Sequence, residues 1–229
     1  MARRISRDTR GAAEGTTSYT DVVDRDTLLR LGDQAVLVPV KAFGQAKERL
    51  GPTLSRTERS RLARAMATTV LGAAAPLPVA VVCDDPDVAQ WARSLGALVV
   101  WEPGRGLNGA VEAGICRLTE AGVTQVTVAH GDLPLAENLI ELGTFAGITL
   151  VPDRAGNGTN VISLPTKTTF RFSYGPGSFA RHLAEAELTG LAVRVLHDER
   201  LASDVDEPGD LAFMAGLVAP PTPPAVAHA

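Results

Sequence analysis

Residues 125–135 of the chain read Gln-Val-Thr-Val-Ala-His-Gly-Asp-Leu-Pro-Leu. The first five are mostly β-branched or small and apolar, and glycine and proline follow within a few residues. This stretch therefore predicts a short buried strand over 125–129 that ends in a loop. Asp132 stands in that loop. In an open α/β sheet it would lie beyond the carboxyl end of the strand, where such sheets bind their ligands.

Short apolar runs alternate with longer helix-like segments on both sides of this strand, and such alternation predicts βαβ units. We therefore expect an α/β fold, in which a mostly parallel sheet carries helices on both faces. The predicted strands are 35–40, 79–83, 97–101, 125–129, 148–151, 161–164 and 191–196, and the predicted helices are 57–75, 87–95, 107–121 and 179–188.

The composition supports an aliphatic core. Hydrophobic residues make up 45% of the 229 residues and aromatic residues only 4%, which favours buried parallel strands covered by Ala-rich helices. The net charge of −4 argues against a nucleic-acid partner, because surfaces that bind nucleic acid are usually basic. The sequence contains no run of 18 apolar residues, which argues against a membrane span. We expect a soluble, cytoplasmic protein.

The two ends of the chain differ from its centre. Residues 1–32 are polar and charged, and we expect a disordered extension there. Residues 219–229 are rich in Pro and Ala and predict a disordered tail, because proline cannot continue a helix. This leaves a folded domain at 33–218. Cys83 and Cys116 have no metal-ligand spacing, so we expect two reduced, buried thiols.

Three cations follow the first predicted strand, namely Lys41, Lys47 and Arg49. Positive charge at the carboxyl end of a strand suits a triphosphate, whose charge must be neutralised before its α-phosphorus can be attacked. These three are the candidate catalytic residues. The alternative is a solvated surface loop.

A glycine-rich stretch, 104–110, follows a strand and opens a helix. Its glycines would let the backbone approach a ligand, and the helix start offers free N–H groups. Asn108 could hydrogen-bond a base or ribose, and we count Arg105, Leu107, Lys41 and Lys47 with it as candidate nucleotide-binding residues. The alternative is a plain turn in which Asn108 caps the helix.

Three aspartates are candidate metal ligands. Asp132 follows the central strand, and carboxylates at that place typically hold Mg²⁺ that also binds phosphates. Asp204 and Asp206 are two residues apart, so on an extended segment both would face one cation while Val205 faces away. The alternatives are a turn or cap role for Asp132 and an N-cap role for Asp206.

Two small-residue segments, 156–160 and 173–179, supply hydroxyls and free backbone N–H groups. Together they suggest a second anion site beside the first, and the alternative is a pair of loops, the second capped by Ser178. His182, which lacks a partner at ligand spacing, is assigned no role.

Over residues 35–215 the chain resembles the guanylyltransferases of coenzyme F-420 biosynthesis. The motifs that carry the resemblance are Val38-Pro39-Val40-Lys41, Lys47-x-Arg49-Leu50, Gly106-Leu107-Asn108, Gly131-Asp132-Leu133-Pro134, Gly158-Thr159-Asn160, Tyr174-Gly175-Pro176-Gly177-Ser178-Phe179 and Asp204-Val205-Asp206. The Tyr-Gly-Pro-Gly-Ser-Phe segment is the most specific of them.

The resemblance implies a three-layer α/β/α sandwich of the Rossmann-like nucleotide-diphospho-sugar transferase fold. It implies a cytoplasmic nucleotidyltransferase that moves GMP from GTP onto phosphoenolpyruvate, giving enolpyruvoyl-2-diphospho-5'-guanosine, or alternatively onto 2-phospho-L-lactate. By similarity, Thr159, Gly175 and Ser178 would bind the acceptor, and the three aspartates would hold Mg²⁺.

More distant alternatives stay open from the sequence. A sugar-phosphate or molybdopterin nucleotidyltransferase would share the N-terminal half and Asp132, and a non-catalytic module would bind GTP without releasing diphosphate. Oligomeric state is also open, and a homodimer is one state that the chain could adopt.

Overall fold

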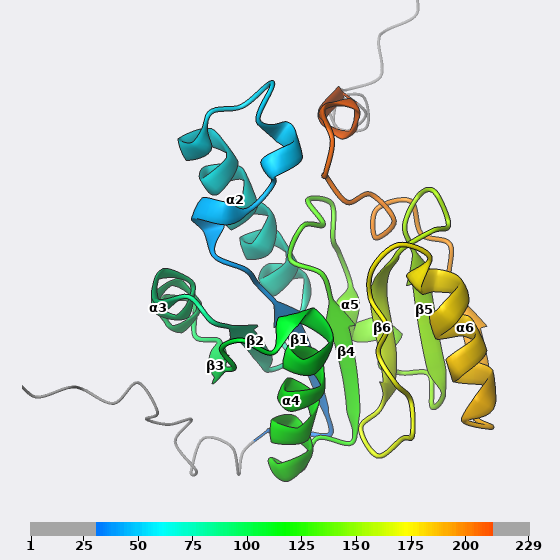
Figure 1. Cartoon of the computed structure of the whole chain (residues 1–229). Coiled ribbons are helices and arrows are strands. Elements are labelled where there is room, and N and C mark those ends of the chain that lie inside the picture. The colour runs from blue at the N-terminus through cyan, green and yellow to red at the C-terminus, as the bar shows by residue number, and fades with distance from the viewer. Residues whose placement is uncertain (1–30, 213–229) are drawn as a thin grey trace, which may run out of the picture.

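The computed structural model describes residues 31–212. Within that range seven strands form one sheet, in the order β3-β2-β1-β4-β6-β5-β7 (Figure 1). The strands are β1 (Gln34–Pro39), β2 (Val79–Cys83), β3 (Leu98–Trp101), β4 (Gln125–Ala129), β5 (Ile148–Pro152), β6 (Thr159–Pro165) and β7 (Val193–Val195). Each predicted apolar run is a strand, and the predicted ends of β2 and β4 match those in the structure.

The sheet is mostly parallel, as predicted, and β6 is the strand that runs the other way. β1, β2, β3 and β4 pair in parallel, and so do β5 and β7. β6 pairs antiparallel with both β4 and β5. The reason is the short connection between β5 and β6, since a parallel crossover needs about a dozen residues or more. This reversal puts the start of β6 at the same edge as the carboxyl ends of β4 and β5.

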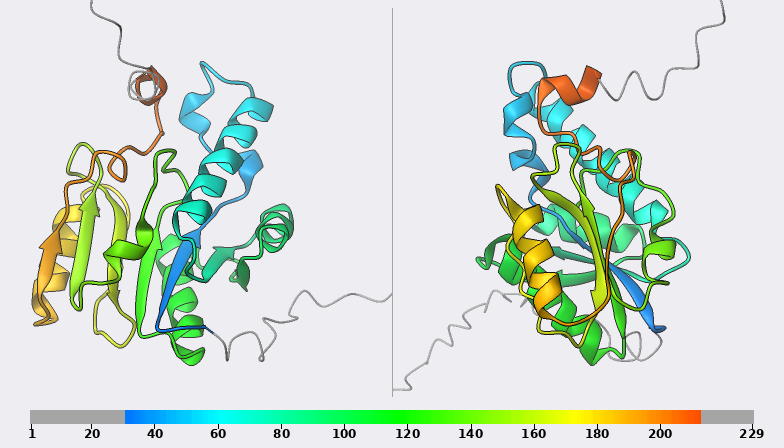
Figure 2. Two further views of the ribbon diagram at one scale, coloured as in Figure 1. Left: turned by 180° about the vertical axis from the view of Figure 1, so that it is seen from behind. Right: turned by 90° about the vertical axis from the view of Figure 1, so that its right-hand side faces the viewer.

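Helices cover both faces of the sheet, which confirms the three-layer arrangement. α2 and α3 pack with Val36 and Val38 on one face, and α4 and α6 lie on the other, where α4 packs with Ala35 and Leu37. The edge-on view at the right of Figure 2 shows α2 and α6 on opposite sides of the strands. The helices are α2 (Arg56–Ala73), α3 (Pro86–Ser94), α4 (Gly106–Glu120), α5 (Leu139–Leu142) and α6 (Ser178–Leu188), with two 3-10 turns, η1 (Phe43–Gln45) and η2 (Glu48–Leu50).

Local signals fix where the helices begin. Ser55 and Glu58 form a capping box at the start of α2. Asp85 accepts the N–H of Val88 at the start of α3, with Pro86 in the first turn. Such caps satisfy backbone donors that a helix start leaves without partners. Among residues 31–212, the helices include none that is both long and apolar enough to cross a bilayer.

The expectation for the cysteines is right for Cys83 and wrong for Cys116. Cys83 is buried at the end of β2, and burial raises the pKa of its thiol to about 11. Cys116 is exposed, because it follows the core-facing Ile115 on α4 and the helix turns about 100° per residue. The predicted extension and tail fall mainly on 1–30 and 213–229, which lie outside the described residues.

Gly147 should be intolerant of any side chain, because it lies where β5 pairs with β7. A Cβ there would collide with the carbonyl oxygen of Ala192 and with the Phe145 ring. Gly147→Ala is expected to lower the free energy of unfolding by about 1–3 kcal/mol through overpacking. Gly72→Ala is the control, because nothing lies within 4 Å of a Cβ built there on α2. Equal urea midpoints for the two variants would contradict the prediction.

Candidate active site

A lysine lies between two carboxylates at the carboxyl edge of the sheet. Lys47 Nζ donates to Asp132 Oδ2 at 2.6 Å and to Asp206 Oδ1 at 2.8 Å. Lys47 follows β1, Asp132 follows β4, and Asp206 comes after β7, so the fold joins three distant parts of the chain. In Figure 1 the blue segment after β1 and the orange helix after Asp206 face each other above this edge. At the edge predicted to hold the site, Lys47 thus bridges the carboxylates of Asp132 and Asp206.

The three charges of this cluster support one another. Only 7% of the Lys47 side chain is exposed. Burial by itself would lower the pKa of Lys47, but Asp132 and Asp206 outweigh it and raise that pKa. Burial would likewise raise the pKa of Asp132, and the charge of Lys47 lowers it instead. The ammonium and the Asp132 carboxylate are therefore both ionised near neutral pH.

The two acids near the end of the domain flank a buried residue, as predicted. Val205 is buried against Leu50 and Met66, so its neighbours in sequence face the site. Asp204 Oδ1 accepts Asn160 Nδ2 at 3.2 Å. Burial, and next the charge of Asp132, raises the pKa of Asp204 to about 6.

The alternative role of Asp206, as the N-cap of the next helix, is not found among the hydrogen bonds of residues 31–212. Asp210 Oδ2 accepts the backbone N–H groups of Asp206 and Glu207 at 3.0 and 2.8 Å. The side chain of Asp206 is instead turned to Lys47. The Asp206 carboxylate therefore binds the ammonium of Lys47 at the centre of the site.

The donor set suits a hard divalent cation such as Mg²⁺, which prefers oxygen ligands. Asp132 Oδ1 is buried and has no hydrogen-bonding partner among residues 31–212, so one carboxylate oxygen is left to coordinate. Lys47 stands where positive charge is needed between Asp132 and Asp206. Within the described range, however, no three acidic, His or Cys side chains are close enough together to enclose a metal as they stand. The metal role of the three aspartates stays a prediction.

The other two predicted phosphate-binding cations are on the surface. Lys41 is exposed and lines a hollow of about 330 Å³ with Gln45, Asp84 and Asp85. Arg49 is largely exposed and lies 3.8 Å from Glu207. An ion pair this long and exposed contributes little to stability. The Arg49 side chain could therefore turn to an incoming phosphate at small cost, whereas Lys47 is already held in place.

The glycine-rich stretch opens α4, but Asn108 is not its N-cap. The N-cap is Arg105, which pairs with Glu102 at 2.7 Å. Asn108 lies inside the first turn, and its Oδ1 accepts the backbone N–H of Tyr174 at 2.8 Å. Leu107 and Tyr174 both pack against the same core cluster. The predicted nucleotide-binding turn is thus fastened to the segment predicted to bind the acceptor.

The two predicted acceptor segments are tied together. Asn157 Oδ1 accepts the N–H of Gly177 at 3.1 Å, and Asn157 O accepts that of Phe179 at 3.2 Å. Gly177, with φ of 72°, is the N-cap of α6 and makes no side-chain cap bond, so Ser178 begins the helix rather than capping it. Gly175 has φ of 122°, a backbone conformation that glycine adopts readily. Gly175 O also accepts the N–H of Ser178 at 2.9 Å, so the N–H groups of residues 177–179 at this helix start already have partners.

Sequence reasoning gave no role to the aromatic cluster behind these segments. The Tyr174 ring lies 4.9 Å from the rings of both His130 and His182. Tyr174 Oη and His130 Nε2 are buried without a hydrogen-bonding partner among residues 31–212. Lone histidines and tyrosines carry no spacing signal, so this cluster could not be found from the sequence.

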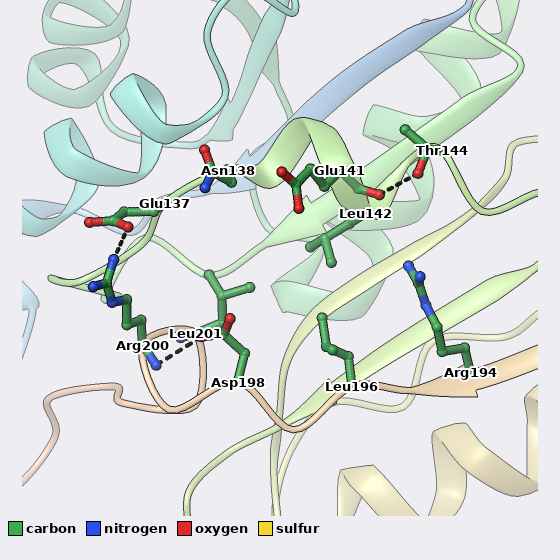
Figure 3. A pocket seen from close by; sticks show the side chains of 10 residues that line it. All are labelled: Glu137, Asn138, Glu141, Leu142, Thr144, Arg194, Leu196, Asp198, Arg200 and Leu201. Carbon is green, nitrogen blue, oxygen red and sulfur yellow. Dashed lines mark hydrogen bonds and ion pairs between the residues drawn. The ribbon is translucent and has the colours of Figure 1, made fainter.

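A larger hollow, of about 530 Å³, lies between α5 and the segment that follows β7 (Figure 3). It is lined by residues from 137–144 and 194–201, and none of the predicted site residues is among them. Its charged side chains are of both signs, and Glu137 pairs with Arg200 across it. The hollow is therefore separate from the cluster around Lys47.

The strand order, with one reversed strand and acids at the carboxyl edge, defines an α/β protein of the nucleotide-diphospho-sugar transferase fold. The same fold occurs in a candidate nucleotide-diphospho-sugar transferase from Desulfovibrio desulfuricans G20. That structure superposes with a TM-score of 0.67 at 16% identity, over 80% of this chain and 87% of that one.

The family is shown by sequence. The profile of the family described as "Guanylyl transferase CofC like" matches residues 34–216, and the chain belongs to this family. The chain is 40% identical to a phosphoenolpyruvate guanylyltransferase from Rubrobacter xylanophilus, over 77% of this chain and 90% of that protein. It is 36% identical to a 2-phospho-L-lactate guanylyltransferase from Methanothermobacter thermautotrophicus, over 76% of this chain and 81% of that protein.

Proposed function

We propose that the protein is a Mg²⁺-dependent phosphoenolpyruvate guanylyltransferase, which transfers GMP from GTP to phosphoenolpyruvate and releases diphosphate. The observation that carries the proposal is the buried Lys47 held between Asp132 and Asp206, in a fold that also links the two segments predicted to bind the acceptor. Relatives that cover most of the chain are named for this reaction. The second candidate acceptor is 2-phospho-L-lactate, which the name of one relative favours.

The reaction needs charge neutralisation more than proton transfer. A phosphate oxygen of the acceptor attacks the α-phosphorus of GTP, the new O–P bond forms, and the bond to the β-phosphate oxygen breaks. The acceptor phosphate is already a nucleophile near neutral pH, so no general base is required. Two anions must meet, however, and Lys41, Lys47 and Arg49 would neutralise that charge.

Asp132, Asp204 and Asp206 would hold the metal, and a bound Mg²⁺ would stabilise the charge that develops on the phosphates. The segment that carries Gly175 and Ser178 would bind the acceptor, with the Ser178 hydroxyl as a donor, because the N–H of Ser178 is already bonded to Gly175 O. Holding both substrates in line removes a large entropic part of the barrier, about 7–11 kcal/mol in well-oriented cases.

Diphosphate release tests the proposal. With GTP and Mg²⁺, phosphoenolpyruvate is expected to give diphosphate, and EDTA is expected to stop the reaction. Faster release with 2-phospho-L-lactate would favour the second acceptor. Release only with a sugar phosphate would show that the protein is a nucleotidyltransferase for a different acceptor. GTP binding without release for any acceptor would make it a binding module and overturn the proposal.

A further inference from the structure

His182 joins the two segments predicted to bind the acceptor. It lies on α6 and is fully buried. Its Nε2 accepts the backbone N–H of Ser173 at 2.9 Å. Its Nδ1 lies 3.0 Å from Thr159 Oγ1. One imidazole therefore contacts both the start of β6 and the segment that carries Gly175 and Ser178.

These two contacts define the tautomer of His182. A backbone N–H can only donate, so Nε2 must carry a lone pair rather than a hydrogen. Burial, and next the charge of Arg181, lowers the pKa of His182 to about 4, and the ring is neutral near pH 7. A neutral ring with a bare Nε2 carries its hydrogen on Nδ1. Nδ1–H therefore donates to Thr159 Oγ1.

The ring is held in this orientation by its neighbours. Tyr174 packs edge-on at 4.9 Å, and Phe170 lies 5.6 Å away. A flipped ring would set carbon atoms against the N–H of Ser173 and leave a buried donor without a partner, which costs about 1–3 kcal/mol.

The consequence falls on the hydroxyl of Thr159. This side chain is 1% exposed, and its oxygen already receives the His182 proton. Its own hydrogen must point elsewhere, and within residues 31–212 the structure gives Thr159 Oγ1 no second partner. A buried hydroxyl hydrogen in this state suits an anionic oxygen brought by a ligand.

We propose that His182 is a positioning residue for the acceptor, because it holds the Thr159 hydroxyl as a donor to an anionic oxygen of the phosphorylated acid. The inference rests on the proposed function for the identity of that acid. His182 acts through Thr159 and through the N–H of Ser173, and it does not contact the reacting atoms.

The tautomer can be measured without turnover. In the NMR spectrum of ¹⁵N-labelled, unliganded protein, Nε2 of His182 is expected to have the ¹⁵N chemical shift of an imidazole nitrogen without hydrogen. Nδ1 is expected to have the chemical shift of a nitrogen that carries hydrogen. His182→Gln identifies the signals by their loss. A hydrogen on Nε2 would overturn the inference. Because this measurement needs no acceptor, it decides the tautomer even if the protein transfers GMP to no phosphorylated acid.

Two substitutions separate the two contacts in steady-state kinetics. Glutamine keeps an acceptor near Nε2 but has no donor at Nδ1, whereas asparagine keeps a donor near Nδ1. His182→Gln is expected to raise KM for phosphoenolpyruvate about 10-fold or more, with KM for GTP changed less than about 2-fold. His182→Asn is expected to restore most of the loss. Equal changes in both KM values would indicate a merely structural role.

A double-mutant cycle tests whether His182 acts through Thr159. In a Thr159→Val background, His182→Gln is expected to add little further change in KM for the acceptor, because the group it positions is already gone. Phe172→Leu, which changes packing near His182 but no hydrogen bond, is the control for stability. Fully additive effects of His182→Gln and Thr159→Val would contradict the inference.

Discussion

Asp132→Asn is expected to lower kcat/KM for guanylyl transfer by about 10²–10³-fold, the effect typical of losing one key electrostatic group. The substitution keeps the shape of the side chain and removes its charge. It leaves Lys47 with one carboxylate partner, and it replaces one of the two oxygens of Asp132 by an amide NH2, which cannot bind a metal. The site would then bind the metal, and with it the nucleotide phosphates, more weakly.

Two controls accompany this variant. Asp87→Asn removes an exposed acid in the first turn of α3, and its kcat/KM is expected to equal that of the wild type. Thermal unfolding of Asp132→Asn separates loss of chemistry from loss of fold, because removing one partner of a buried ion pair can destabilise a protein by about 3–5 kcal/mol. Near-normal turnover at saturating Mg²⁺ would remove Asp132 from the metal site.

Lys47→Met is expected to lower kcat by about 10²-fold or more while Mg²⁺ binds more tightly. The side chain neutralises two acids in the unliganded protein and phosphates in the proposed reaction, so turnover falls without it. Because its ammonium occupies Asp132 and Asp206, its removal frees both carboxylates for the metal.

Calorimetric titration with Mg²⁺ and steady-state kinetics measure the two effects separately. Lys167→Met is the matched control, since Lys167 is exposed and follows β6 at the opposite edge of the sheet. Weaker Mg²⁺ binding by Lys47→Met together with unchanged kcat would show that the lysine supports the metal site rather than competing for it.

Most of the fold could be predicted, because its signals are local. Aliphatic runs define the strands, and caps such as Ser55 and Asp85 define the helix starts, so the predicted helix 57–75 differs little from α2. The direction of β6 could not be predicted, because an apolar run looks the same in either direction. Only the short connection between β5 and β6 indicates the reversal. It does so once it is known that β5 and β6 are paired neighbours in the sheet.

The candidate site was predictable in part, for a related reason. The position of Asp132 follows from the strand before it. Its partner Lys47 was expected to bind phosphate, but its ion pairs join residues 85 and 159 positions apart and leave no local pattern. The alternatives in which Asn108 and Ser178 cap their helices are wrong, because Arg105 and Gly177 occupy those places.

The reversed strand β6 brings two different supersecondary units to one edge of the sheet. The parallel strands β1 and β4 lead into Lys47 and Asp132, whereas the hairpin of β5 and β6 brings Thr159 and Asn160 to the same edge. On the proposed function, the machinery for the nucleotide and the determinants of the acceptor are encoded in different supersecondary units. A change of acceptor during divergence would then fall on Thr159 and the segment at 173–179, whereas Asn160, which holds Asp204, would be kept for the metal site.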